Sequence, residues 1–324
     1  VNYYKIENQL TWSNLEYDDT LLHRPLYFYF GARHRYIELA GYMPTTIFRQ
    51  WTATGGMRWT FSNYYHLAIN ANYVFGDYNG NDYHGKATIG RWFGNDTVNK
   101  GELAIIAEIS RQAPGYFFQE YYANNFTWKN NFAKTEYLMG EIVYRWRNFN
   151  IGGTYLQVKN YVALDLDAKP FQVNSTFNIL RAFLYKDFKI GKFDLIGKLI
   201  YQNASNTDAI KLPDLLTYFS FIFTTPIFGG AATIQPGMDI FYCTNYYADA
   251  YMPALRSFHL QGEKQIGNYP FVDLFFMVRI KRAKLLLKYQ NLSGLFGNYT
   301  YYTEPHYPMN DPSFKFGVSW KFFD

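Results

Sequence analysis

A period-two alternation of apolar and polar residues is the feature that most constrains what this chain can fold into. The final segment shows it most plainly, because every second residue is large and apolar while the residues between them are small or basic. Successive side chains of a β-strand point to opposite faces of a sheet, so this spacing predicts a strand with one apolar face. We expect these residues of the C-terminal strand to face lipid: Phe314, Phe316, Val318, Trp320 and Phe322.

The pattern recurs along the chain and predicts fifteen strands. Most of them are longer than the usual strand of a soluble sheet, about 5–6 residues. Their length is typical of tilted membrane strands. The predicted strands span 3–12, 26–40, 47–61, 64–75, 83–93, 101–112, 133–147, 149–163, 171–187, 193–203, 215–228, 231–243, 271–280, 284–291 and 313–323.

Short and long joins alternate along most of the chain. The short joins are Ser62-Asn63, Asn148, Gly229-Gly230 and Lys281-Arg282-Ala283; the long ones are 76–82, 113–132, 204–214, 244–270 and 292–312. This connectivity predicts an all-β fold: a transmembrane antiparallel up-and-down β-barrel of about 14–18 strands, with short periplasmic turns and long external loops. We expect one domain over residues 1–324. An odd strand number cannot close such a barrel with both termini inside, so either the count is off by one or residues before Val1 add a strand.

Composition excludes several other classes of protein. Aromatic residues make up 21% of the chain, which is far more than a disordered chain carries, and Cys243 alone cannot form a disulfide framework. The mean hydropathy of −0.28 argues against a bundle of membrane helices. Leu215 to Met238 contains no charged residue, but Gly229-Gly230 lies in its interior and favours a hairpin. A large soluble barrel or propeller is the alternative, and Tyr and Trp residues near the predicted turns favour the membrane barrel.

Two basic residues depart from the pattern. Arg91 and Arg181 are assigned to the lipid face, where an Arg at the midplane costs roughly 2–4 kcal/mol. Arg91 lies near a strand end, so its side chain can reach the interface. Arg181 lies nearer the middle of its segment, and we expect a β-bulge to shift the register there.

Several sequence landmarks resemble a known family. They are the runs 307–314, 268–275, 280–284 and 288–292, with weaker matches at 6–12 and 75–79. Together they resemble the putative-porin family of Bacteroidetes outer membranes, and some are shared with TonB-dependent receptors of the same bacteria. The resemblance implies a barrel of the Gram-negative outer membrane whose C-terminus lies in the periplasm, and the terminal aromatic strand resembles the signal read by the barrel-assembly machinery.

The polar faces of the predicted strands define a candidate pore lining. As a set, these residues predict a polar and mildly basic interior, although for each one alone a structural ion pair such as Asp194–Lys198 or Glu141–Arg145 is the favoured interpretation. The predicted pore-lining residues are Arg58, Lys86, Glu108, Glu141, Arg145, Asp194, Lys198, Asp239, Asp273, Arg279, Lys284, Lys288, Lys315 and Lys321.

The sequence carries no recognisable catalytic or metal-binding motif. Its six histidines are scattered, without the H-E-x-x-H spacing of a zinc site, and no spacing brings a Ser, a His and an acid together. We therefore predict no enzyme activity, no metal and no cofactor. The net charge of +5 comes from singly spread basic residues. A nucleic-acid surface would gather them into a patch, so we predict no nucleic-acid partner.

Three hypotheses for function remain. The first is an outer-membrane porin-like channel for passive diffusion of small hydrophilic solutes, with a mild preference for anions. The second is a closed accessory β-barrel within a multi-protein outer-membrane complex, and the third is a fragment of a TonB-dependent receptor. The expected partners are outer-membrane lipid and lipopolysaccharide, the barrel-assembly machinery during insertion, and, for the second hypothesis, other outer-membrane proteins.

Overall fold

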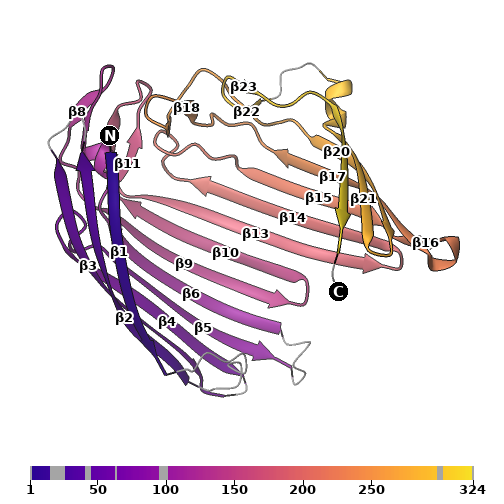
Figure 1. The fold of residues 1–324 in the computed structure, drawn as a ribbon, viewed down its shortest axis with the longest axis horizontal. Coiled ribbons are helices and arrows are strands. Elements are labelled where there is room, and N and C mark those ends of the chain that lie inside the picture. The colour runs from indigo at the N-terminus through magenta and orange to yellow at the C-terminus, as the bar shows by residue number, and fades with distance from the viewer. Residues whose placement is uncertain are drawn as a thin grey trace. The chain divides into compact units, whose positions relative to one another are not determined.

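The computed structural model describes residues 2–14, 26–40, 45–62, 64–94, 101–297 and 302–322. The chain divides into two compact units. Figure 1 labels the strands that they contain. Unit 1 contains Val1–Arg147 and Gly153–Leu180, and unit 2 contains Asn148–Gly152 and Arg181–Asp324. No helix of the described residues is long and apolar enough to cross a membrane.

Unit 1 is an antiparallel meander, in which each long strand pairs with the next long strand in the chain. Its order is β1-β2-β3-β4-β5-β6-β9-β10. The strands are β1 (Asn2–Ser13), β2 (Leu26–Ala40), β3 (Thr46–Thr60), β4 (Tyr65–Gly76), β5 (Tyr83–Phe93), β6 (Gly101–Gln112), β9 (Thr135–Trp146) and β10 (Phe149–Lys159). The first residues of β10 belong to unit 2.

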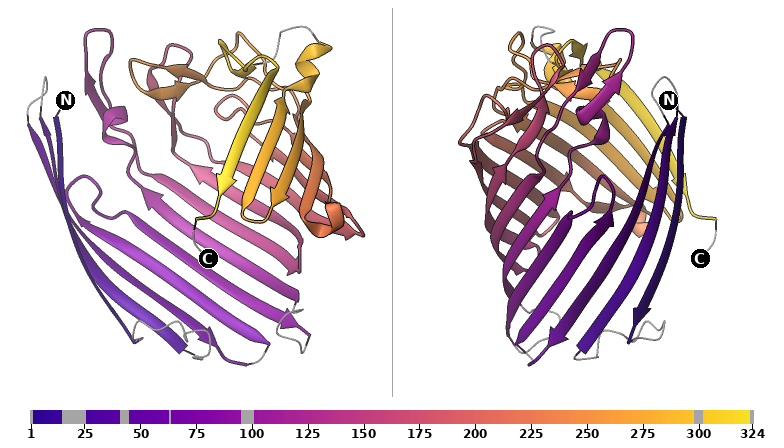
Figure 2. Two further views of the ribbon diagram at one scale, coloured as in Figure 1. Left: turned by 45° about the vertical axis from the view of Figure 1, so that its right-hand side comes forward. Right: turned by 90° about the vertical axis from the view of Figure 1, so that its left-hand side faces the viewer.

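Unit 2 repeats this arrangement, with β13-β14-β15-β17-β20-β21-β24 as its strand order (Figure 2). A short strand, β16 (Thr225–Ile227), also pairs with β17. The long strands are β13 (Phe177–Ile190), which begins in unit 1, β14 (Phe193–Ala204), β15 (Leu215–Phe223), β17 (Ala232–Cys243), β20 (Phe271–Ile280), β21 (Ala283–Gln290) and β24 (Ser313–Trp320).

The long joins are folded, not extended. Four of them carry small two-stranded hairpins that pair with nothing else among the described strands. These joins contain α1 (Tyr116–Gln119), β7 (Glu120–Tyr122) with β8 (Thr127–Lys129), β11 (Tyr161–Leu164) with β12 (Pro170–Val173), β18 (Ala250–Met252) with β19 (Ser257–His259), and β22 (Tyr302–Glu304) with β23 (Tyr307–Pro308). Two short 3₁₀ turns are also present. η2 (Phe228–Gly230) lies between β16 and β17, and η3 (Leu292–Leu295) follows β21.

The strand predictions are largely confirmed. The ranges 26–40, 83–93, 101–112 and 271–280 match the observed strands residue for residue. Three predicted strands, 149–163, 171–187 and 215–228, are wrong in being continuous. In the last of them, Thr224 separates β15 from β16. Asn160 has a φ of 55° and separates β10 from β11, and 174–176 separates β12 from β13. A left-handed residue points the chain out of a sheet's plane, so the strand ends there.

The hairpin turns at the other end of the strands are as short as predicted. Arg147, Lys281 and Gly229 all have positive φ, with values of 49°, 48° and 61°. Such values match the right-handed twist of the flanking strands in a tight hairpin. The hairpin predicted in Leu215 to Met238 is confirmed, since Gly229 and Gly230 form the turn between β16 and β17. The predicted Ser62-Asn63 turn falls partly outside the described residues.

The antiparallel up-and-down fold is confirmed, and closure is not observed. Among the described residues, β1 pairs with β2 and β24 with β21, and neither makes a further ladder. The described strands therefore form no closed barrel. A closed barrel, its number of strands and the single domain stay predictions.

Candidate functional site

Each unit has one apolar and one polar face, set by the parity of its strands. The register between neighbouring strands places polar residues opposite polar residues. Lys86 of β5 faces Glu108 of β6, and Asp239 of β17 faces Asp273 of β20. The apolar faces are widely exposed, as a lipid-facing surface is. On the C-terminal segment the five predicted lipid-facing side chains are between 57% and 76% exposed.

One carboxylate on the polar face of unit 1 gathers bases from two other strands. Glu102 of β6 lies 3.1 Å from His66 Nε2 through one oxygen and 3.1 Å from Arg145 Nη1 through the other. His66 belongs to β4, so its ring has to cross β5 to reach β6. Gly90 of β5 makes this possible, because a Cβ there would lie 2.0 Å from the imidazole.

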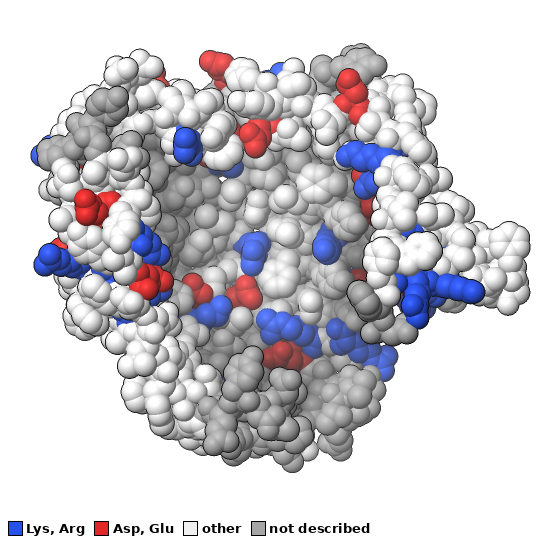
Figure 3. Space-filling view, in the orientation of Figure 1, with Lys and Arg blue, Asp and Glu red and all other residues white. Residues whose placement is uncertain are grey.

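The other acids on this face are paired in a similar way. Glu108 lies 3.1 Å from His84 and 3.6 Å from Lys86. Glu7 of β1 lies 2.8 Å from Arg35 Nε and 3.1 Å from Lys5. Figure 3 shows acidic and basic side chains lying next to one another on the face in view. These contacts are short, so the charges neutralise one another locally.

The described contacts of Glu141 and Arg145 join neighbouring strands. Arg145 pairs with Glu102, and the Glu141 carboxylate accepts a hydrogen bond of 2.8 Å from the Thr154 hydroxyl of β10. Residues four apart on one strand are roughly 13 Å apart along it, whereas residues opposite each other are within about 5.5 Å. Geometry therefore favours partners across the ladder over the i, i+4 pairing that the sequence suggested.

Unit 2 has a comparable cluster around Lys288 of β21. Its Nζ lies 2.7 Å from Asp273 and 4.0 Å from Asp239. The Tyr218 hydroxyl donates to Asp239, and the backbone N–H of Asn291 donates to Asp273. Asp239 and Asp273 face each other across the ladder, so the ammonium offsets their mutual repulsion.

The suggested pair of Asp194 and Lys198 takes different partners. Asp194 lies 3.9 Å from Lys189 of β13. The Lys198 ammonium lies 5.5 Å from the ring centre of Tyr185 and 5.6 Å from that of Tyr218. A cation over aromatic faces is stabilised without an acid.

Several predicted pore-lining bases have no acidic partner among the described residues. Arg279 and Lys284 face each other across β20 and β21, and Lys315 of β24 faces Lys288. Lys321 follows the end of β24, and its backbone N–H donates to Arg282. Arg58 of β3 lies opposite Tyr27 and Ala68. The side chains without acidic partners are all exposed, so solvent screens their charges. They are Arg58, Arg279, Lys284, Lys315 and Lys321.

The assignment of Arg181 to the lipid face is wrong. On β13 the exposed apolar side chains are Leu180, Leu184, Phe188 and Ile190, which alternate with Arg181. Tyr185 shares the parity of Arg181 and contacts Lys198 of the polar face, so no bulge is needed to spare lipid an arginine. Arg91 does lie on the apolar face, where its guanidinium stacks on Tyr65 and Phe93 near the strand end.

The polar face also carries charged residues that are absent from the predicted pore lining. Four of them take part in ion pairs or line the cavity described below: Glu7, Arg33, Arg35 and Glu102. The signal was present in β2, because Phe28 and Phe30 fix the apolar parity and place both arginines on the other side.

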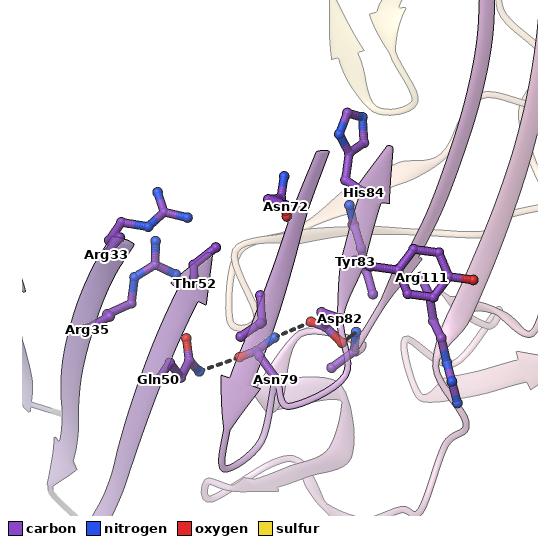
Figure 4. Close-up of a pocket in the computed structure, with 13 residues that line it drawn as sticks. Arg33, Arg35, Gln50, Thr52, Asn72, Asn79, Asp82, Tyr83, His84 and Arg111 are labelled. Carbon is purple, nitrogen blue, oxygen red and sulfur yellow. Dashed lines mark hydrogen bonds between the residues drawn. The ribbon is translucent and has the colours of Figure 1, made fainter. Parts of the chain in front are cut away.

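A cavity of about 330 Å³ opens on the polar face of unit 1, at the end of the strands that leads into the 77–82 join. Arg33 and Arg35 enter it from β2, Gln50 and Thr52 from β3, and Asn72 from β4 (Figure 4). Its remaining lining residues are Val74, Asn79, Asp82, Tyr83, His84, Arg111, Gln112 and Ala113.

The 77–82 join beside this cavity is tightly held. Asp82 lies 2.6 Å from Lys134 Nζ and also accepts hydrogen bonds from Asn79 and the Ala113 backbone. Tyr78 packs edge-on against Tyr116, and its hydroxyl donates to the Pro114 carbonyl. Burial raises the pKa of Tyr78 to about 12. The join is therefore a built structure and not a loose loop.

Among the described residues, no group of three His, Cys, Asp or Glu side chains is placed to hold a metal ion. Cys243 lies at the end of β17 as a free thiol.

A profile of the family described as "Putative porin" matches residues 2–324. No curated protein sequence matches the chain significantly.

The fold is similar to that of solved outer-membrane β-barrels. The ferric enterobactin receptor PfeA in complex with BCV-L6 gives a TM-score of 0.68 at 10% identity, over 98% of this chain and 54% of that one. The siderophore receptor PirA from Pseudomonas aeruginosa gives 0.60 at 10% identity, over 90% and 53%. The ferric yersiniabactin uptake receptor FyuA from Yersinia pestis gives 0.54 at 13% identity, over 98% and 52%. The chain spans about half the length of these structures, and at such identities the likeness concerns the fold alone.

Proposed function

Because the chain belongs to the putative porin family, we propose that it forms an outer-membrane channel for passive diffusion of small hydrophilic solutes, with a mild preference for anions. The strands would surround a wet lumen lined by the polar faces, with their apolar faces toward lipid. The lumen residues would be those predicted from the sequence, together with Lys5, Glu7, Arg33, Arg35, Glu102, Arg181, Asp187 and Lys189.

The observation that carries this proposal is the unequal pairing of charges on the polar faces. The acids are engaged by bases or hydroxyl donors, as Glu102, Glu108 and Asp273 illustrate. Arg58, Arg279, Lys284 and Lys315 remain without acidic partners among the residues described. Fixed positive charge raises the local concentration of mobile anions wherever the pore is narrow relative to the screening length of about 8 Å.

Planar-bilayer recordings of the purified protein in a salt gradient test the proposal. We expect a conductance whose reversal potential indicates mild anion preference. The variant Arg279→Gln/Lys284→Gln/Lys315→Gln should shift that potential toward cation preference, because it removes unpaired charge without exposing a partner acid.

The matched control is Lys129→Gln/Lys169→Gln/Arg256→Gln, which neutralises three basic residues of the joins. Its reversal potential should stay close to that of the wild type. A cation-selective wild type, or equal shifts in both variants, contradicts the anion preference.

A closed accessory barrel is the second candidate, because aromatic side chains are exposed in the joins and not only on the strands. Phe117 of α1 is 43% exposed, Phe258 of β19 is 50% exposed, and Phe296 after η3 is 84% exposed. Exposed aromatic residues away from lipid fit a protein partner. Absence of any conductance in the recordings favours this candidate. The match to the family over residues 2–324 favours both over a receptor fragment.

A further inference from the structure

The cavity of unit 1 carries one positive charge that the described residues do not compensate. The four other Arg, Asp and His residues of the lining have partners: Arg35 with Glu7 at 2.8 Å, Asp82 with Lys134 at 2.6 Å, His84 with Glu108 at 3.1 Å and Arg111 with Glu136 at 3.7 Å. Arg33 has no acidic partner among the residues that the structure describes.

Arg35 adds donors to this charge. Glu7 accepts from its Nε, and no residue in the described part of the chain accepts from its terminal nitrogens. Arg33 and Arg35 share a face of β2 and extend into the same cavity (Figure 4). Guanidinium groups bind carboxylates through paired, charge-assisted hydrogen bonds, so this wall of the cavity suits an oxyanion.

Beside the arginines, β3 and β4 supply neutral hydrogen-bonding side chains, with Thr52 opposite Arg33 and Gln50 opposite Arg35 in the ladder. Thr52 is 7% exposed and, like Asn72, makes no side-chain hydrogen bond with the described residues. Gln50 is 3% exposed and uses Nε2 on Asn79, at 2.6 Å, which leaves its Oε1 as an acceptor. These groups offer both donors and acceptors to the hydroxyls of a solute, next to the cationic wall.

We propose that this cavity is a binding subsite for small sugar acids, which combine a carboxylate with several hydroxyls. The inference rests on the proposed channel function, because it names the solute class that the channel would take up at its external end. The carboxylate would lie against Arg33 and the free edge of Arg35, and the hydroxyls against Gln50, Thr52 and Asn72. A volume of about 330 Å³ accommodates a monosaccharide with water.

Ligand-observed saturation-transfer NMR on the detergent-solubilised full chain tests binding without requiring conductance. Galacturonate is the probe. Galactose, which has the hydroxyls but no carboxylate, and acetate, which has the carboxylate but no hydroxyls, are the comparison ligands. We expect galacturonate to bind at least tenfold more tightly than either, and its affinity to fall as salt is raised.

The variant Arg33→Gln should weaken galacturonate binding at least tenfold. Arg58→Gln is the matched control, because Arg58 is another polar-face arginine without an acidic partner among the described residues and lies outside the cavity. Its affinity should stay within twofold of the wild type. Equal binding of galactose and galacturonate, equal binding of acetate, or equal losses in the two variants overturns the proposal.

The two hypotheses fail separately. A conducting channel that does not bind galacturonate overturns the subsite and leaves the channel standing. Binding by a protein that conducts nothing contradicts the channel and retains the subsite as the site of a closed barrel.

Discussion

The polar faces of the two units manage charge differently. In unit 1 each of Glu7, Glu102 and Glu108 holds two bases, and even the 77–82 join is tied by the pair of Asp82 and Lys134. In unit 2 the strands at the C-terminal end carry basic residues that lie opposite other basic residues. Arg279 faces Lys284, and Lys288 faces Lys315.

This difference separates two uses of charge in one type of sheet. Paired charges fix the positions of side chains, and their fields largely cancel within a few ångströms. Unpaired charges on neighbouring strands repel one another at a cost of roughly 0.2–1 kcal/mol per pair. Their field reaches the solvent, so they contribute more to ion preference than to stability.

The largest loss of stability is expected from a change on the apolar face, a feature that each unit has. Val318→Lys places an ammonium between Phe316 and Trp320 on the exposed face of β24, and should lower the free energy of unfolding by about 2–4 kcal/mol in bilayers. Urea titration of the protein in lipid vesicles measures this.

Ser319→Lys is the control for that change, since Ser319 is the next residue and belongs to the polar face. It faces Lys284, so a loss below about 1 kcal/mol is expected from like-charge repulsion. Equal losses at the two positions would show that the apolar face does not meet lipid.

Strand parity accounts for how much could be predicted. Phe314, Phe316, Val318 and Trp320 fix the faces of β24, and the same rule places Lys284 and Lys288 without any structural information. It failed for Arg181, because the break at 174–176 was not recognised and β13 was taken with the wrong parity.

The pairing within the site could not be predicted in the same way. Which base meets which acid depends on register between strands, and on single glycines such as Gly90, which lets His66 reach Glu102 two strands away. The cavity depends on the fold of the 77–82 join, whose hydrogen bonds with residues about 30 to 50 positions away leave no periodic signal.

The tight 77–82 join of unit 1 predicts a pH effect. The pKa of Tyr78 is raised to about 12 by burial, from 10.0. A raised pKa means that the neutral phenol stabilises the fold fully below pH 10, and that this contribution is lost as pH rises from 10 through 12. The linked loss is about 2 kcal/mol after allowing for partial exposure.

Tyr78→Phe removes that ionisation. Between pH 10 and pH 12 the free energy of unfolding of the wild type should fall more steeply than that of the variant, as followed by denaturant titration at each pH. Parallel curves would mean that Tyr78 is as accessible as a tyrosine in water.

The smallest predicted effect compares a paired and an unpaired charge directly. Glu102→Gln weakens the contacts to His66 and Arg145 and leaves the arginine without its carboxylate, so it should cost about 1–2 kcal/mol of stability. Lys315→Gln should change stability by less than about 0.5 kcal/mol, because the ammonium is exposed and has no acidic partner among the described residues.

A double variant sharpens that comparison. In Glu102→Gln/Arg145→Gln both charges of the pair are gone, and part of the loss from the single change should return, because the uncompensated arginine is removed. Denaturant titrations of the two single variants and the double variant give the coupling free energy. Coupling near zero, or a loss in Lys315→Gln as large as in Glu102→Gln, would mean that the charges of unit 1 are no more structural than those of unit 2, and that ion preference must then be sought equally on both polar faces.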